Sequence, residues 1–111
     1  KSLPRFIKRK RELHLKYKHY FSEKGISVFE ERKGTKSNYW LNAILLKDPE
    51  QKDIFLKETN AAGVMTRGLW NPMHRLKMYE KCMRTDLRNT EELFDRVVNI
   101  PSSVVQCKGE E

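Results

Sequence analysis

Apolar residues recur every three or four positions through the first part of the chain, the spacing of one face of a helix. The pattern predicts a helix over residues 4–24, with Pro4 in its first turn and Gly25 as its stop. Lys10 interrupts the apolar stripe. The stripe consists of Leu3, Phe6, Ile7, Leu13, Tyr17, Tyr20 and Phe21.

Three further segments have the composition of strands. Residues 26–31 alternate in polarity, which predicts a short strand. Residues 38–47 are almost continuously apolar, so we expect this strand to be central in its sheet. Residues 64–70 alternate again, and Pro72 prevents that strand from continuing as a paired central strand.

Two more helices are predicted after the central strand. Asp48 is placed to cap a helix over residues 49–62, which has Pro49 in its first turn. A helix over residues 90–98 has Asn89 or Thr90 as its cap and acidic residues in its first turn, where the helix dipole favours them. The remaining segments are a helical turn over 74–81, a loop over 86–89 and extended chain over 99–103.

The order of these elements, α-β-β-α-β-α-β, predicts an α/β (α+β) fold with a small mixed or antiparallel sheet and helices packed on one side. Residues 1–111 are enough for a single domain, with a helix over 4–24, the sheet and other helices over 26–103 and a tail over 104–111. Because the chain starts at Lys1 rather than at a methionine, we expect it to be a fragment of something longer.

Positive charge is concentrated in the first helix. Residues 1–24 carry +7 of the net charge of +8, and the rest of the chain is nearly neutral. This helix could bind phosphates, with Tyr17 and Tyr20 as stacking surfaces, so a small nucleic-acid-binding domain is one alternative. A domain that docks on an acidic protein is another. The plainer interpretation is a solvated basic face over a packed apolar face.

Composition places the chain among soluble globular domains, with 38% apolar and 34% charged residues. No apolar run approaches the roughly 20 residues of a membrane helix, so we expect no membrane partner and a cytoplasmic location. Cys82 and Cys107 are expected to be reduced thiols, although a single disulfide is an alternative. No His or Cys lies at metal-ligand spacing from either cysteine, so no metal site is expected.

Arg67, Trp70 and His74 are the strongest candidates for a binding site. They cluster around the Asn71–Pro72 break after a predicted strand. Arginine can hold a phosphate or carboxylate through two hydrogen bonds, tryptophan can stack on a ring, and histidine can donate to a phosphate or sugar oxygen. Taken singly, they could also be a surface ion pair, a buried anchor and a capped loop histidine. His14 and His19 are not expected to be catalytic.

Several stretches, in the right order, resemble the C-terminal domain of the DegT/DnrJ/EryC1/StrS aminotransferases, which aminate keto sugars on nucleotide carriers. Residues 3–21 look like the helix that leaves the family's large domain, and residues 37–42 like its first long strand. Residues 63–79 are similar to its strand and substrate loop, and residues 99–103 to its Asn-Ile-Pro strand. The sequences of these stretches are most similar to those of bacterial 4-aminotransferases of the legionaminic-acid and perosamine type.

The resemblance implies a homodimeric enzyme of the type I pyridoxal-phosphate fold, of which this chain is the C-terminal small domain. The cofactor and its lysine would belong to an N-terminal large domain upstream of Lys1, so no catalytic residue is expected here and the fragment alone should be inactive. The substrate would be a 4-keto-6-deoxy nucleotide sugar for surface polysaccharide synthesis, with glutamate as the amino donor. The residues expected to contact the substrate are Arg67, Trp70, His74 and Tyr79.

Two departures from the family pattern affect the substrate loop. The family usually has Arg-Pro where this chain has Arg67-Gly68, and it often has two prolines where Lys77 and Met78 precede Tyr79. Both departures leave the loop freer to move.

Overall fold

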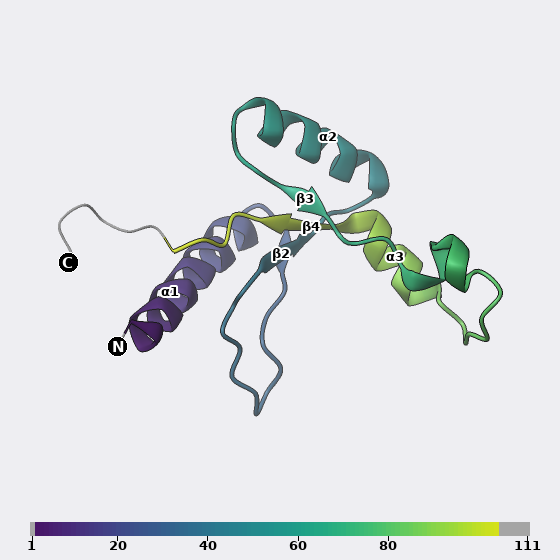
Figure 1. Cartoon of the computed structure of the whole chain (residues 1–111). Helices are drawn as coiled ribbons and strands as arrows, with labels where there is room; N and C mark the ends of the chain where they lie inside the picture. Colours follow the sequence, from purple (N-terminus) through teal and green to yellow (C-terminus); the bar gives the residue numbers. More distant parts are fainter. Residues whose placement is uncertain (1, 105–111) are drawn as a thin grey trace.

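A four-stranded antiparallel sheet forms the centre of the molecule (Figure 1). The structure, a computed structural model, describes residues 2–104; Cys107 and the predicted tail beyond residue 104 lie outside the described residues. The strand order is β1 (Ser27–Val28), β2 (Asn42–Leu45), β4 (Val97–Ile100) and β3 (Arg67–Gly68). The segment predicted to be central is therefore central, and the predicted fold class is confirmed.

In the described part of the chain, three α-helices accompany the sheet: α1 (Leu3–Ser22), α2 (Pro49–Ala61) and α3 (Arg88–Arg96). The first two agree closely with the prediction because their end signals are local. The Asp48 carboxylate accepts a hydrogen bond from the Gln51 backbone N–H at 2.8 Å, which caps α2. Gly25, just beyond α1, has a φ of +69°, a conformation that glycine adopts without strain. Within residues 2–104, no helix is both long and apolar enough to cross a bilayer.

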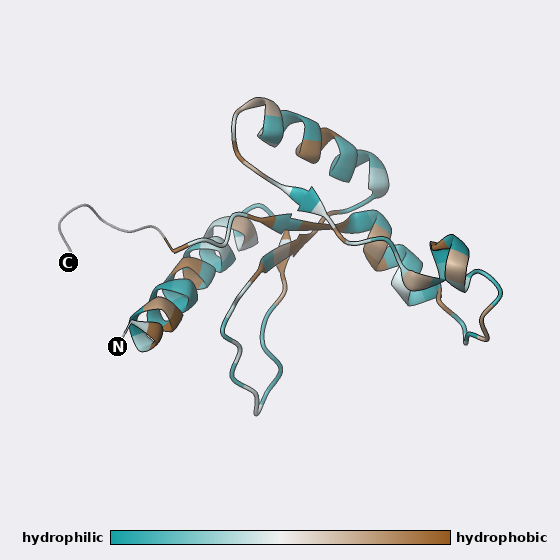
Figure 2. Ribbon diagram, viewed as in Figure 1, coloured by the Kyte–Doolittle hydropathy of each residue, from teal (hydrophilic) through white to brown (hydrophobic). Residues whose placement is uncertain are grey.

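The core lies between two helices and one face of the sheet. Ile44 and Val98 are paired across β2 and β4 and are fully buried. Tyr17 and Phe21 of α1 and Phe55 and Leu56 of α2 belong to the same cluster, together with Leu46 and Ile100. Both helices therefore cover one face, as predicted. Figure 2 shows hydrophobic residues along the central strands and mostly hydrophilic residues on α2.

The apolar stripe predicted for α1 is only partly buried. Leu3 and Tyr20 are 67% and 53% exposed, whereas Phe21 is buried and Tyr17 is packed against the core. The first half of the helix extends past the sheet, so its apolar side chains do not reach the core (Figure 1).

The predicted strands are longer than the paired ones. Residues 26–31 pair only at Ser27–Val28, and residues 64–70 only at Arg67–Gly68. In the segment 38–47, pairing begins at Asn42, because Tyr39 has a φ of +47° and breaks the extended chain. Alternating polarity marks extended chain, but pairing depends on a neighbour elsewhere in the sequence.

The third helix is displaced from its prediction. It begins at Arg88, and Leu87 is its cap position, with no side-chain hydrogen bond from Asn89 or Thr90. It ends at Arg96 because the next two residues pair in β4 with β2 rather than continuing the helix. The predicted helix over 90–98 is thus wrong at both ends, and the predicted loop over 86–89 already contains the first two residues of α3.

Residues 72–87 form an arm that projects from the sheet beside α3 (Figure 1). The predicted helical turn is present in the arm as two short 3-10 turns, η1 (Met73–Arg75) and η2 (Lys77–Tyr79). Met83 on the arm is fully exposed, and Met78 is 75% exposed.

Candidate functional site

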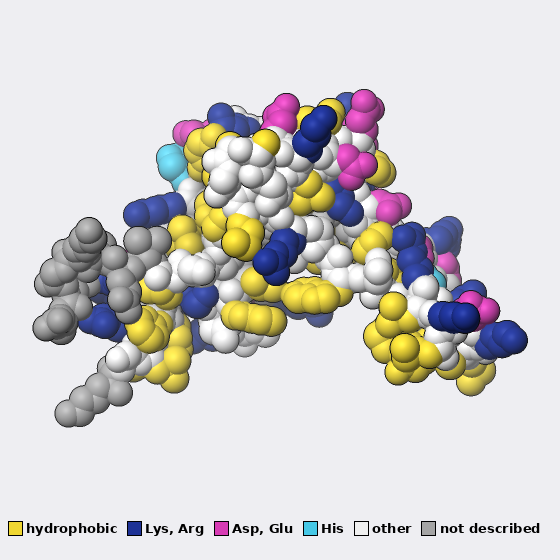
Figure 3. Space-filling model, turned by 45° about the horizontal axis from the view of Figure 1, so that its top comes forward, with side chains coloured by type: hydrophobic (Ala, Val, Ile, Leu, Met, Phe, Trp, Pro, Cys, Tyr) yellow, Lys and Arg dark blue, Asp and Glu magenta, His cyan; other side chains and the backbone are white. Residues whose placement is uncertain are grey.

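The face of the sheet opposite α1 and α2 holds a cavity of about 600 Å³, which we call the sheet hollow. Arg67 is paired with Asn99, and Asn99 with Ala43, so their side chains share this face. The volume lies in the range of about 300–1,000 Å³ typical of small-molecule sites. Residues 40–41, 65, 67–70 and 99–103 line the sheet hollow. In the space-filling view, hydrophobic side chains gather in the middle of the molecule next to basic ones (Figure 3).

Arg67 is the cation of the sheet hollow. Its side chain is exposed, and its guanidinium donates to the Met65 sulfur at 3.3 Å. Within the described part of the chain it makes no ion pair with a carboxylate, and no acidic residue is among those lining the hollow. A guanidinium with free N–H groups can bind a phosphate or a carboxylate through two parallel hydrogen bonds.

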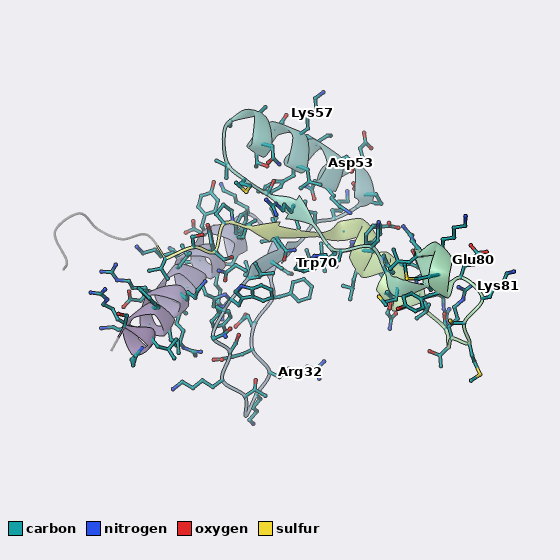
Figure 4. All side chains as sticks on the ribbon, in the orientation of Figure 1. Arg32, Asp53, Lys57, Trp70, Glu80 and Lys81 are labelled. Carbon is teal, nitrogen blue, oxygen red and sulfur yellow. The ribbon has the colours of Figure 1, made fainter. Side chains whose placement is uncertain are left out.

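Two tryptophans, Trp40 and Trp70, also line the sheet hollow and are 66% and 70% exposed. Trp70 follows β3 and lies on the opposite side of the sheet from Asp53 and Lys57 of α2 (Figure 4). Trp40 comes from the segment just before β2. Exposed indoles in a cavity offer flat surfaces on which an aromatic or sugar ring can stack.

An ion pair from α1 holds the segment that leads to Trp40. Arg11 donates to both Glu31 oxygens, at 2.6 and 3.0 Å, and to the Ser37 carbonyl at 2.6 Å. The Arg11 hydrogen bond, with help from the Ser37 N–H, lowers the pKa of Glu31 to about 2. The same contact raises the pKa of Arg11. The loop after β1 is thereby tied to the helix, while Arg32 lies out along the same loop, away from the sheet (Figure 4).

His14 forms a buried polar group at the start of β2. Its Nδ1–H donates to the Asn42 side-chain oxygen at 3.0 Å, and its ring stacks on Tyr39 with 3.7 Å between centroids. The Ser102 hydroxyl accepts from the Asn42 backbone N–H at 2.7 Å and donates to the Ile100 carbonyl at 2.8 Å. These contacts join α1, β2 and the end of β4 next to the sheet hollow.

His74 and Tyr79 lie on the arm and line a different cavity of about 400 Å³, the arm hollow. His74 Nε2 contacts the Glu91 carboxylate of α3, which also pairs with Arg75. The Arg75 hydrogen bond is the largest cause of the lowered pKa of Glu91, and His74 adds to it. Arg75 also lies over the Phe94 ring, 4.6 Å from its centroid. The arm is thus fastened to α3 through one carboxylate.

The four residues expected at the substrate therefore occupy two places. Arg67 and Trp70 share the sheet hollow, and His74 and Tyr79 share the arm hollow. Figure 4 shows the same separation, with Trp70 beneath the sheet and Glu80 and Lys81 on the arm. Sequence reasoning assigned Trp40 to a continuously apolar strand and did not include it among the candidate residues, although it lines the sheet hollow.

The described residues contain no group of three or more His, Cys, Asp or Glu side chains placed to hold a metal ion. Cys82 on the arm is an exposed free thiol.

Related proteins share both the sequence and the fold. The sequence profile of the DegT/DnrJ/EryC1/StrS aminotransferase family matches residues 1–110. GDP-perosamine synthase of Escherichia coli O157:H7 is 31% identical over 98 residues, which are 87% of this chain and 26% of that protein. The chain therefore spans about a quarter of the length of this curated relative.

Solved structures of two aminotransferases have the same fold. TlmJ from Streptoalloteichus hindustanus matches with a TM-score of 0.83 at 21% identity, over 96% of this chain and 29% of TlmJ. Helicobacter pylori PseC matches with a TM-score of 0.76 at 17% identity, over 88% of this chain and 28% of PseC. The resemblance inferred from the sequence motifs is confirmed, and the chain belongs to the DegT/DnrJ/EryC1/StrS aminotransferase family.

Proposed function

We propose that this chain is the C-terminal small domain of an aminotransferase that uses pyridoxal phosphate to move an amino group to a keto sugar on a nucleotide diphosphate. Family membership supports this, as do two relatives, one named GDP-perosamine synthase and the other described as an aminotransferase involved in the biosynthesis of pseudoaminic acid. The finer proposal is a 4-keto-6-deoxy sugar as acceptor and glutamate as donor, in surface polysaccharide synthesis. The enzyme is proposed to be a cytoplasmic homodimer, with its large domain as the partner of this chain.

The observation that carries the proposal is the Arg67 guanidinium in the sheet hollow. It has no acidic partner in residues 2–104, although the chain is rich in carboxylates elsewhere. Trp70 lies in the same cavity and offers a flat apolar surface. A nucleotide sugar presents phosphates and rings, which are the groups that an arginine and a tryptophan recognise.

The residues described do not fit the cofactor itself. Pyridoxal phosphate is attached to its enzymes through a lysine amine, and no lysine lines the sheet hollow. Lys10, beside the hollow, has its ammonium hydrogen-bonded to two carbonyl oxygens. We therefore assign the cofactor to another part of the enzyme and only substrate contacts to this chain.

We also propose that His74 and Tyr79, which line the arm hollow, contact the substrate. His74 Nε2 is engaged by Glu91, but Nδ1 makes no hydrogen bond within the described residues. In the neutral ring Nδ1 can accept from a sugar hydroxyl, and in the charged ring it can donate to a phosphate. Alanine at His74 should therefore raise the Michaelis constant for the nucleotide sugar.

The nucleic-acid alternative is less well supported, because several cations of α1 are engaged within the chain. Arg11 is paired with Glu31, Lys18 with Glu30, and Lys8 lies 4.0 Å from Glu12. Lys10 is bound to backbone carbonyls. Salt-dependent binding to duplex or single-stranded DNA would support this alternative.

The first test is the absorbance of the full-length protein that contains this chain. Bound pyridoxal phosphate gives a band in the near-visible region that should decrease when glutamate is added. A full-length protein without such a band, even after incubation with the cofactor, would contradict the proposed activity.

The second test concerns Arg67 in the same full-length enzyme. Loss of a hydrogen bond to a charged group costs about 1.5–3 kcal/mol, so Arg67→Ala should raise the Michaelis constant for the nucleotide sugar about tenfold or more. Lys57→Ala is the control, because Lys57 is an exposed cation of α2 on the other side of the sheet from Trp70 (Figure 4). An unchanged Michaelis constant for Arg67→Ala would remove Arg67 from the site.

A further inference from the structure

Trp40 shares the sheet hollow with Trp70 and Arg67, and its backbone is held from both sides. We propose that Trp40 is a second stacking residue for the base of a nucleoside diphosphate, and that Lys10 of α1 positions it. This inference rests on the proposed function, since it names the part of the substrate that the sheet hollow receives.

The direction of Trp40 follows from the residue before it. Tyr39 is only 7% exposed and has a φ of +47°, in the left-handed region that a tyrosine seldom adopts. Its ring is stacked on His14, with the Arg11 guanidinium 5.3 Å from its centroid. Tyr39 is therefore fixed against α1, while Trp40, the next residue, is 66% exposed in the sheet hollow.

Lys10 connects the backbone of Trp40 to that of Ser102, another residue that lines the hollow. Its ammonium donates to the Ser102 carbonyl at 2.6 Å and to the Trp40 carbonyl at 3.3 Å. The Trp40 N–H donates to the Asn38 side-chain oxygen at 2.9 Å, so both backbone groups of this residue are held. Residues 40 and 102 both line the hollow, so the Lys10 side chain, together with the Asn42–Ser102 hydrogen bond, ties two parts of the lining to each other.

The lining of the sheet hollow favours a ligand that is both aromatic and anionic. Two indoles provide stacking surfaces, Arg67 provides a cation without an acidic partner in the described chain, and no described acidic residue lines the cavity. A purine or pyrimidine base stacks on an indole irrespective of its identity, and a diphosphate matches a guanidinium. A nucleoside diphosphate combines these two features in one molecule.

The test is calorimetric titration of the full-length protein with UDP and with GDP, which requires no turnover. Stacking of one base on an aromatic side chain is worth about 1–3 kcal/mol, so Trp40→Ala should weaken binding at least about fivefold. Trp40→Phe, which keeps an aromatic face, should recover most of the affinity. Tyr20→Ala is the control, since Tyr20 is an exposed aromatic residue of α1 outside the sheet hollow.

Lys10 is tested by its own pair of variants. Lys10→Met removes both hydrogen bonds and should weaken nucleotide binding, whereas Lys10→Arg keeps N–H donors for both carbonyls and should restore it. A purely structural role for Lys10 would lower the melting temperature without changing the dissociation constant of the folded protein. Equal affinity of Lys10→Met and the unaltered protein would overturn its positioning role.

The remaining outcomes separate this inference from the proposed function. If neither UDP nor GDP binds, or if Trp40→Ala binds them as tightly as the unaltered protein, the inference is wrong even in an active aminotransferase. If both nucleotides bind through Trp40 but no pyridoxal band is present, the sheet hollow is a nucleotide site and the proposed aminotransferase activity is wrong.

Discussion

Replacement of His14 by phenylalanine isolates one buried hydrogen bond. His14 is 2% exposed and Asn42 is 1% exposed, and the His14 Nδ1–H donates to the Asn42 side-chain oxygen at 3.0 Å. Phenylalanine keeps a ring that can stack on Tyr39 but has no N–H. The Asn42 oxygen would then be buried without its donor.

The expected cost follows from the fate of that oxygen. A buried acceptor left without a partner costs about 1–3 kcal/mol, and the retained stack adds no further loss, so His14→Phe should lower the free energy of unfolding by about 1–3 kcal/mol. His19→Phe in the same helix is the matched control, because the His19 side chain is 81% exposed. A substitution at an exposed position such as this should change the free energy of unfolding by no more than about 0.5 kcal/mol.

Urea unfolding followed by circular dichroism measures both changes. A double-mutant cycle with Asn42→Leu tests the mechanism, since removal of both polar partners leaves neither of them orphaned. The double variant should therefore be less destabilised than the sum of the two single variants. If His14→Phe and His19→Phe unfold alike, or if the two changes at residues 14 and 42 are additive, the buried hydrogen bond does not stabilise the fold.

Two further predictions concern the ion pair and the core. The pKa of Glu31 is lowered from 4.5 to about 2 by its hydrogen bond to Arg11, so the stabilising pair is fully present above about pH 4.5 and is lost as the pH falls toward 2. Thermal melts should show Glu31→Gln less stable than the unaltered protein at neutral pH, with the difference shrinking in acid; a constant difference would contradict this. Ile44→Ala should cost about 2–5 kcal/mol in urea unfolding because Ile44 is fully buried. Ile54→Ala should change stability by less than about 0.5 kcal/mol because Ile54 is half exposed on α2, and equal effects would refute the proposed core.

The elements that could be predicted from the sequence are those whose ends carry local signals. α2 begins where Asp48 caps it, and α1 stops just before Gly25. The end of α3 could not be predicted in this way, because Val97 and Val98 leave the helix to pair with β2, about fifty residues earlier in the chain. β-branched residues suit a strand better than a helix, but the helical pattern before them concealed that preference.

Sequence reasoning grouped candidate residues correctly in space only where neighbours in sequence are also neighbours in space. Arg67 lies in β3, Trp70 lies two residues beyond the end of that strand, and both line the sheet hollow. Lys10 looked like an interruption of an apolar stripe, whereas its ammonium bridges carbonyls 30 and 92 residues away in the sequence. His14 looked like a residue at the edge of the same stripe, but its partner Asn42 makes it part of the interior.

The outer strands of the sheet are unusually short. β1 and β3 each pair over two residues, so each outer edge presents only a few backbone N–H and C=O groups to another chain. Long exposed edges are the templates on which proteins add foreign strands and aggregate. Edges as short as these leave little backbone for strand addition, so contacts with other polypeptides are expected to use side chains rather than backbone pairing.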